Sequence, residues 1–95
     1  MLHFKINSLE QRNAIEGLAY HVADAAYISE RYSLDDPEYI VAHNNTLYCF
    51  AELDLLGVPF WVQNSIIAFA GDWRQYKRES MSEWLLKNRS IDLAI

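Results

Sequence analysis

A run of apolar residues at helical spacing, which begins at Phe60 and continues to about Lys87, constrains the fold more than any other feature. Residues 60–87 place a mostly apolar set on one stripe at about 100° per residue, with Ser80 in the same phase: Val62, Ile66, Phe69, Ala70, Trp73, Ser80, Met81 and Trp84. Gly71 interrupts this composition but not its phase, so the pattern predicts one long third helix over residues 60–87 that can bend near Gly71. The alternative is a break, with Asp72 capping a separate helix and Gln75 completing a capping box.

A first helix is predicted over residues 8–32. Ser8 followed by Gln11 has the spacing of a capping box, and Glu10 in the first turn suits the helix dipole. Apolar residues then recur at helical spacing as far as Tyr32.

A second helix is predicted over residues 37–56, because Asp36 before Pro37 is typical of a helix start and Gly57 is typical of a helix end. Its interior is less clear, since strand-forming residues flank Asn44 and Asn45. A hairpin over residues 39–51 is therefore the alternative.

The remaining segment, at the N-terminus, alternates apolar and polar residues from Leu2 to Ile6, which is typical of a short strand or extended arm. Residues 1–95 fit a single domain. Three glycines and two prolines leave little material for the turns of an all-β fold. We therefore expect a mostly α fold, a small bundle of three helices with an extended N-terminal arm, or an α+β fold if the hairpin forms.

The chain shows no secretory signal pattern and no apolar run long enough for a membrane helix. Its one cysteine, Cys49, cannot form an internal disulfide, which favours a reducing compartment and predicts a cytoplasmic protein. No cofactor or metal is predicted.

Charge is divided unevenly along the chain. Residues 1–60 carry nine acidic and three basic side chains, whereas residues 61–95 carry four acidic and five basic ones. The acidic part predicts binding by charge complementarity, so the leading hypothesis is a non-catalytic interaction or regulatory protein. In its sharper form, an acidic patch occupies the basic nucleic-acid cleft of a partner complex, as an inhibitor from a mobile element would. The residues of that patch are Glu30, Asp35, Asp36 and Glu38.

Aromatic side chains suggest a second contact surface. A helix as long as residues 60–87 would exceed about 40 Å, so its apolar stripe is expected to finish its burial against another chain, in a homodimer or a partner's groove. The residues predicted for partner binding or self-association are Phe60, Trp61, Trp73 and Trp84.

Two alternative functions remain open. The first is nucleic-acid binding through the basic stripe of the C-terminal helix, formed by Arg74, Lys77, Arg78 and Arg89. The second is a small enzyme in which His21 or His43 joins two carboxylates. We favour neither, because opposite charges flank the basic stripe, and the three histidines, which include His3, lack the spacing of a metal or catalytic motif.

Overall fold

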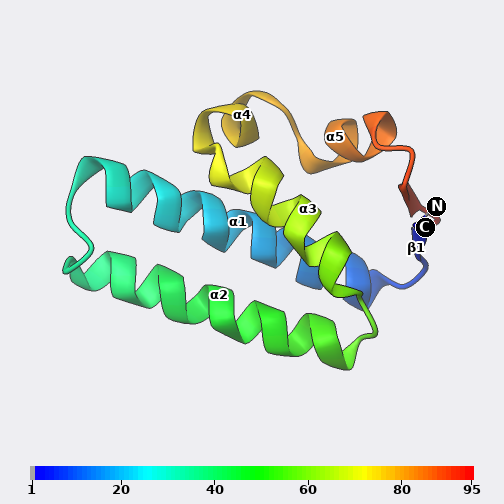
Figure 1. Ribbon diagram of the computed structural model, residues 1–95, viewed down its shortest axis with the longest axis horizontal. Helices are drawn as coiled ribbons and strands as arrows, with labels where there is room; N and C mark the ends of the chain where they lie inside the picture. The colour runs from blue at the N-terminus through cyan, green and yellow to red at the C-terminus, as the bar shows by residue number, and fades with distance from the viewer. Residues whose placement is uncertain (1) are drawn as a thin grey trace.

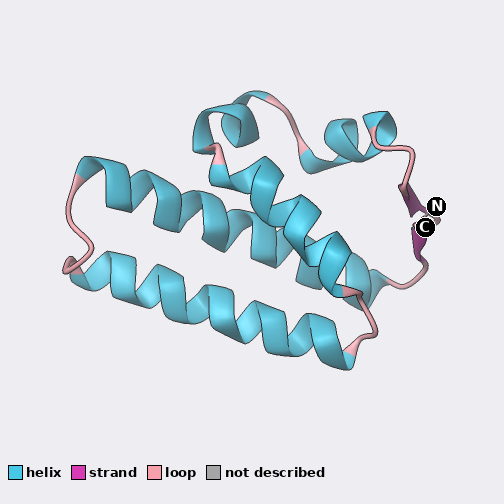
Figure 2. Ribbon diagram, viewed as in Figure 1, coloured by secondary structure: helices cyan, strands magenta, loops and turns pink. Residues whose placement is uncertain are grey.

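The computed structural model describes residues 2–95, most of which are helical (Figure 2). Five helices lie between two short strands in this part of the chain: β1 (Phe4–Ile6), α1 (Leu9–Arg31), α2 (Pro37–Leu55), α3 (Phe60–Gly71), α4 (Trp73–Arg78), α5 (Met81–Lys87) and β2 (Ile91–Leu93). α2 lies along α1, α3 crosses α1, and α4 and α5 follow above α3 in the view of Figure 1. The prediction of a mostly α fold is confirmed, whereas the predicted number of helices is wrong.

The starts of α1 and α2 follow their predicted caps. The Ser8 hydroxyl accepts from the Gln11 amide at 3.1 Å, and the Asp36 carboxylate accepts from the Glu38 amide at 2.9 Å. α2 continues through Asn44 and Asn45, so the hairpin over 39–51 is wrong. Packing on α1 overrides the strand propensity of these residues, and the end signals hold, with Gly57 at a φ of 76°.

The single long helix over residues 60–87 is also wrong, because the chain breaks twice. Asp72 leaves the helical conformation and its side chain accepts from the Gln75 amide at 3.3 Å, as in the alternative considered above. Ser80 has an extended backbone and accepts from the Glu83 amide at 3.1 Å. Each side chain satisfies a helix-start amide that an uninterrupted helix would have bonded to its own carbonyl. The apolar stripe therefore folds back on the molecule.

The N-terminal arm finds its partner at the other end of the chain. β1 and β2 are parallel, with Phe4 opposite Ile91 and Ile6 opposite Leu93. Ile6 and Ile91 are both buried in the main core. The two-stranded sheet thus joins both ends of the described chain to the helices.

One core holds these elements together. Its largest fully buried apolar side chains are Ile6, Ile15, Leu18, Leu53, Val62, Ile66 and Ile91. Gln63 is buried among them, and its amide donates to Asp54 at 2.8 Å and to the Val58 carbonyl at 3.0 Å. These bonds satisfy a polar group that would otherwise be costly to bury.

Candidate functional site

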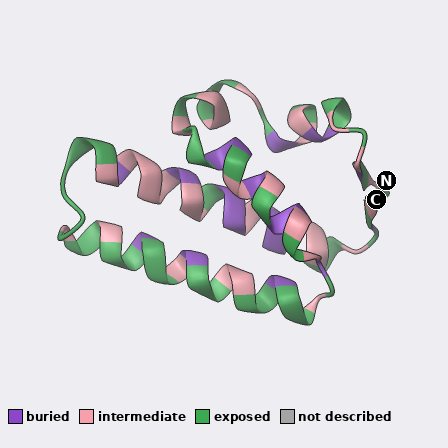
Figure 3. Cartoon of the chain, viewed as in Figure 1, coloured by how far each residue is buried: buried purple, intermediate pink, exposed green. Residues whose placement is uncertain are grey.

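α2 presents an apolar face that the other described residues do not cover. Its members, which we call the outer face of α2, are exposed by 49% at Ile40, 59% at Val41, 51% at Leu47, 82% at Tyr48 and 88% at Leu55. They are spaced so that they share one side of the helix, opposite the buried Ala42, Thr46 and Leu53. Figure 3 shows the outer edge of α2 as mostly exposed along its length.

The arrangement of the helices leaves this face open. α2 packs almost entirely on α1, with a few contacts to α3. Apolar residues occur on both sides of this 19-residue helix, as in a helix covered on both sides, although the exposed Asn44 lies among those of the outer side. An exposed apolar stripe about 22 Å long, at about 1.5 Å per residue from Ile40 to Leu55, is a common mark of an interaction surface.

The charged residues of α2 and of the loop that precedes it are all negative. No lysine or arginine occurs between Arg31 and Arg74. α2 carries Glu38, Glu52 and Asp54, and the preceding loop adds Asp35 and Asp36. The outer face therefore combines an apolar stripe with acidic flanks, which is the complement of a basic amphipathic surface.

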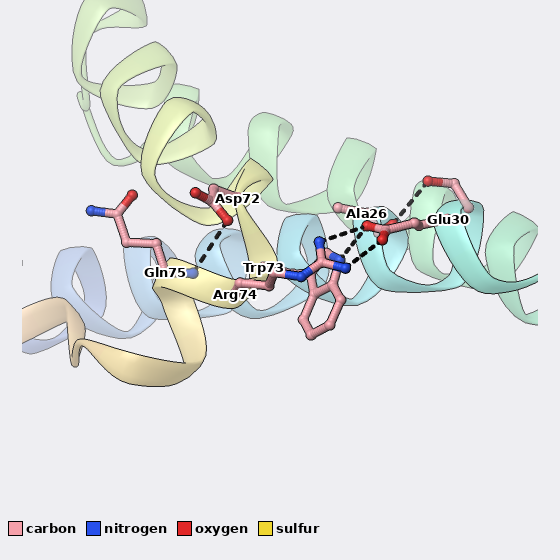
Figure 4. Close-up of polar contacts among 7 residues, drawn as sticks. Ala26, Glu30, Asp72, Trp73, Arg74 and Gln75 are labelled. Atoms are coloured by element: carbon pink, nitrogen blue, oxygen red, sulfur yellow. Dashed lines mark hydrogen bonds and ion pairs between the residues drawn. The ribbon is translucent and has the colours of Figure 1, made fainter.

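The predicted acidic patch divides into two parts. Asp35, Asp36 and Glu38 lie together at the start of α2, and Asp36 caps that helix. Glu30 instead forms a bridge from α1 to α4 (Figure 4). It accepts from the Trp73 indole at 2.7 Å and from both terminal nitrogens of Arg74, at 3.1 and 2.6 Å.

The environment of Glu30 favours its charged form. Hydrogen bonds from Arg74, and then from Trp73, lower the pKa of Glu30 from 4.5 to about 2. The same contact raises the pKa of Arg74. The sequence predicts Glu30 for an acidic partner-binding patch and Arg74 for a basic nucleic-acid-binding stripe. In the structure these two side chains are paired with each other.

The rest of the basic stripe is partly engaged as well. The Lys77 ammonium lies 5.2 Å from the ring centre of Tyr27 and 5.6 Å from that of Trp73. Arg78 and Arg89 are exposed, but Arg89 follows α5 and is not on the helix of Arg74. The breaks at Asp72 and Ser80 therefore divide the single stripe that the sequence predicted.

The four aromatic residues predicted for partner binding or self-association lie in different settings. Phe60 is 70% exposed at the start of α3. Trp61, Trp73 and Trp84 are partly buried and pack on the core. The rings of Trp84 and Phe69 stack at 4.8 Å, and Trp73 meets Tyr27 edge-on at 5.0 Å.

The histidines and the cysteine are dispersed. His3 lies 3.1 Å from Asp92, His21 packs against Tyr20, and His43 stacks on Tyr39. No group of three potential metal ligands occurs within residues 2–95. Burial raises the pKa of the Cys49 thiol, which makes its reactive thiolate less accessible.

The outer face of α2 was missed at the sequence level, although its signal is present. Val41, Tyr48 and Leu55 are seven residues apart, as are Ile40 and Leu47, so one side of α2 is apolar at heptad spacing. Asn44 and Asn45 obscure this pattern, because with their strand-forming neighbours they also fit the turn of a hairpin.

No family model, curated protein or solved structure matches this chain significantly. None of the helices in the part of the chain described by the structure has the length and apolarity needed to span a membrane.

Proposed function

We propose that this chain is a non-catalytic, acidic interaction protein that docks the outer face of α2 on a basic protein partner. The observation that carries this proposal is the apolar stripe from Ile40 to Leu55, on a helix whose only charged residues are carboxylates. A partner helix with an apolar stripe and flanking lysines or arginines matches it in both respects. Apolar burial would supply affinity, and the opposite charges would speed association and fix orientation.

A second copy of this chain matches the outer face less well. Pairing two α2 helices would bring Glu38, Glu52 and Asp54 of both copies together with no lysine or arginine on either helix. Like charges facing each other across an interface oppose association. The homodimer was predicted from the apolar stripe of one long helix over residues 60–87. This reason no longer applies, because the segment forms three separate helices.

The partner we propose is a nucleic-acid-processing complex in the cytoplasm, whose basic cleft the acidic residues occupy. Asp35, Asp36 and Glu38 support this form of the proposal, because Asp35 and Glu38 are exposed and the group lies at the start of the outer face. Carboxylates there can compete with phosphates for lysine and arginine. Direct nucleic-acid binding has less support, because Arg74 is already paired with Glu30.

The test is capture from the source organism by the wild type and by a Leu47→Ser, Tyr48→Ser variant. We expect the partner to be lost with this variant, because both residues lie on the outer face. The matched control is Leu2→Ser with Leu86→Ser, which changes two exposed leucines elsewhere and is expected to retain the partner. Equal capture by the outer-face variant and the wild type would contradict the proposal.

Charge reversal tests the blocking mechanism separately. Replacing Asp35, Asp36 and Glu38 with lysine should release a nucleic-acid-processing complex, and added duplex oligonucleotide should compete with the wild type for it. Unchanged capture by the reversed variant would remove the blocking mechanism while leaving the outer face as a docking surface.

A further inference from the structure

A groove between α1 and α2 borders the outer face and has a volume of about 480 Å³. We call it the tyrosine groove. Three tyrosines and two carboxylates line it, namely Tyr20, Tyr27, Tyr32, Asp24 and Glu38. The described residues that line it include no lysine or arginine. The Arg31 guanidinium lies 5.3 Å from the ring centre of Tyr27, but no such contact occurs at Tyr20 or Tyr32 within residues 2–95. The groove thus offers two tyrosine rings and negative charge without a cation over those rings.

A neighbouring hollow shows what such a lining attracts. Tyr20, Asp24 and Tyr27 also line this second hollow, together with Trp73, Tyr76 and Lys77. Here the chain supplies its own cation, because the Lys77 ammonium lies over the rings of Tyr27 and Trp73. An ammonium or guanidinium group is stabilised over aromatic faces by the ring quadrupole, and a nearby carboxylate adds to this effect.

The groove is continuous with the proposed docking surface. Val41 belongs to the outer face of α2 and also lines the tyrosine groove. A helix lying along the outer face therefore passes the mouth of the groove, where one long side chain from its flank can enter.

We propose that the tyrosine groove binds a cationic side chain of the partner, best matched by the guanidinium of an arginine. This inference rests on the proposed function, since it names the side chain that the partner helix inserts beside the outer face. A guanidinium can stack on the ring of Tyr20 or Tyr32 while its N–H groups donate to Asp24 or Glu38.

The experiment uses N-acetyl-arginine methylamide as the probe and the citrulline derivative, its neutral isostere, as the comparison. We expect NMR shift changes at Tyr20, His21, Tyr27 and Tyr32 with the arginine probe, with a Kd on the order of 10 mM. The citrulline probe should leave these signals unchanged, because it lacks the positive charge.

A matched pair of double variants assigns the binding to the groove. Asp24→Asn with Glu38→Gln should weaken binding about fivefold. Glu10→Gln with Glu83→Gln removes the same charge from exposed residues that do not line the groove, and it should have no effect. An unchanged amide spectrum establishes that each variant remains folded.

Three results would overturn the inference: equal shifts with citrulline, shifts spread over the acidic surface, or equal weakening by both double variants. The probe requires no partner, so such a result removes the cation site and leaves the docking of the outer face standing. Conversely, arginine binding without capture of a partner would contradict the proposed function alone.

Discussion

At the scale of single residues, Glu30 shows how an exposed side chain can connect elements distant in the sequence. It lies at the end of α1, and its three hydrogen bonds reach Trp73 and Arg74 on α4. The sequence predicted Glu30 as part of an acidic patch and Arg74 as part of a basic stripe. Only the tertiary fold shows that the two charges are paired.

Replacing Glu30 with glutamine is expected to lower the urea midpoint of unfolding at pH 6. The pKa of Glu30 falls from 4.5 to about 2 on folding, so its stabilising effect is complete above about pH 4.5 and is lost as the pH falls toward 2. The difference between wild type and variant should therefore shrink in urea titrations at pH 2. Glu52→Gln is the control, and an equal effect from it, or a difference that persists at pH 2, would contradict the bridge.

At the scale of elements, the capping residues decide where helices start. Ser8 and Asp36 were recognised from sequence, because each precedes a clear change from irregular to helical pattern. In the sequence, Asp72 indicates a break only as an alternative to a continuous helix, and Ser80 lies in phase with the apolar stripe. The apolar period continues through both breaks, so periodicity alone could not reveal that two caps divide the segment.

Asp72→Ala and Ser80→Ala should each lower the free energy of unfolding by about 1 kcal/mol, because each removes a helix N-cap. Asn64→Ala, at an exposed site inside α3, is the control and should be neutral or slightly stabilising, since alanine has the higher helix propensity. Chemical denaturation measures all three. If Asp72→Ala and Ser80→Ala instead raised the free energy of unfolding, residues 60–87 would form one continuous helix.

Replacing the glycines near the ends of α2 and α3 with alanine should change the stability of the protein in opposite directions. Gly71 has open space around the position of a Cβ atom, so Gly71→Ala should stabilise by about 0.4–1 kcal/mol through the unfolded state. Gly57 has a φ of 76°, so Gly57→Ala should destabilise by about 1–2 kcal/mol. Thermal unfolding compares the two, and a matching sign would contradict the described backbone.

At the scale of the whole molecule, the fold class could be predicted from sequence, whereas the arrangement could not. The capping patterns and the apolar period predicted the bounds of α1 and α2 to within about one residue. The pairing of β1 with β2 joins segments at opposite ends of the chain, and no local pattern records such a contact. The heptad spacing of Val41, Tyr48 and Leu55 indicates an apolar side of α2, but only the position of α1 shows that this side is exposed.

The joined ends should contribute to global stability. Ile91 is 1% exposed, so Ile91→Ala is expected to lower the free energy of unfolding by about 2–5 kcal/mol. Ile95→Ala, at a site that is half exposed, should change it by less than about 0.5 kcal/mol. Equal small effects in denaturant titrations would mean that the C-terminal strand adds little to the folded core.

Photo-cross-linking tests the outer face of α2 most directly. A benzophenone amino acid placed at Tyr48 in the source organism should cross-link to one partner protein, within a helical segment rich in lysine or arginine. The same group at Asn64, which is exposed on α3, should not capture that segment. A cross-link between two copies of this chain, the same product from both positions, or no product at Tyr48 would contradict the account.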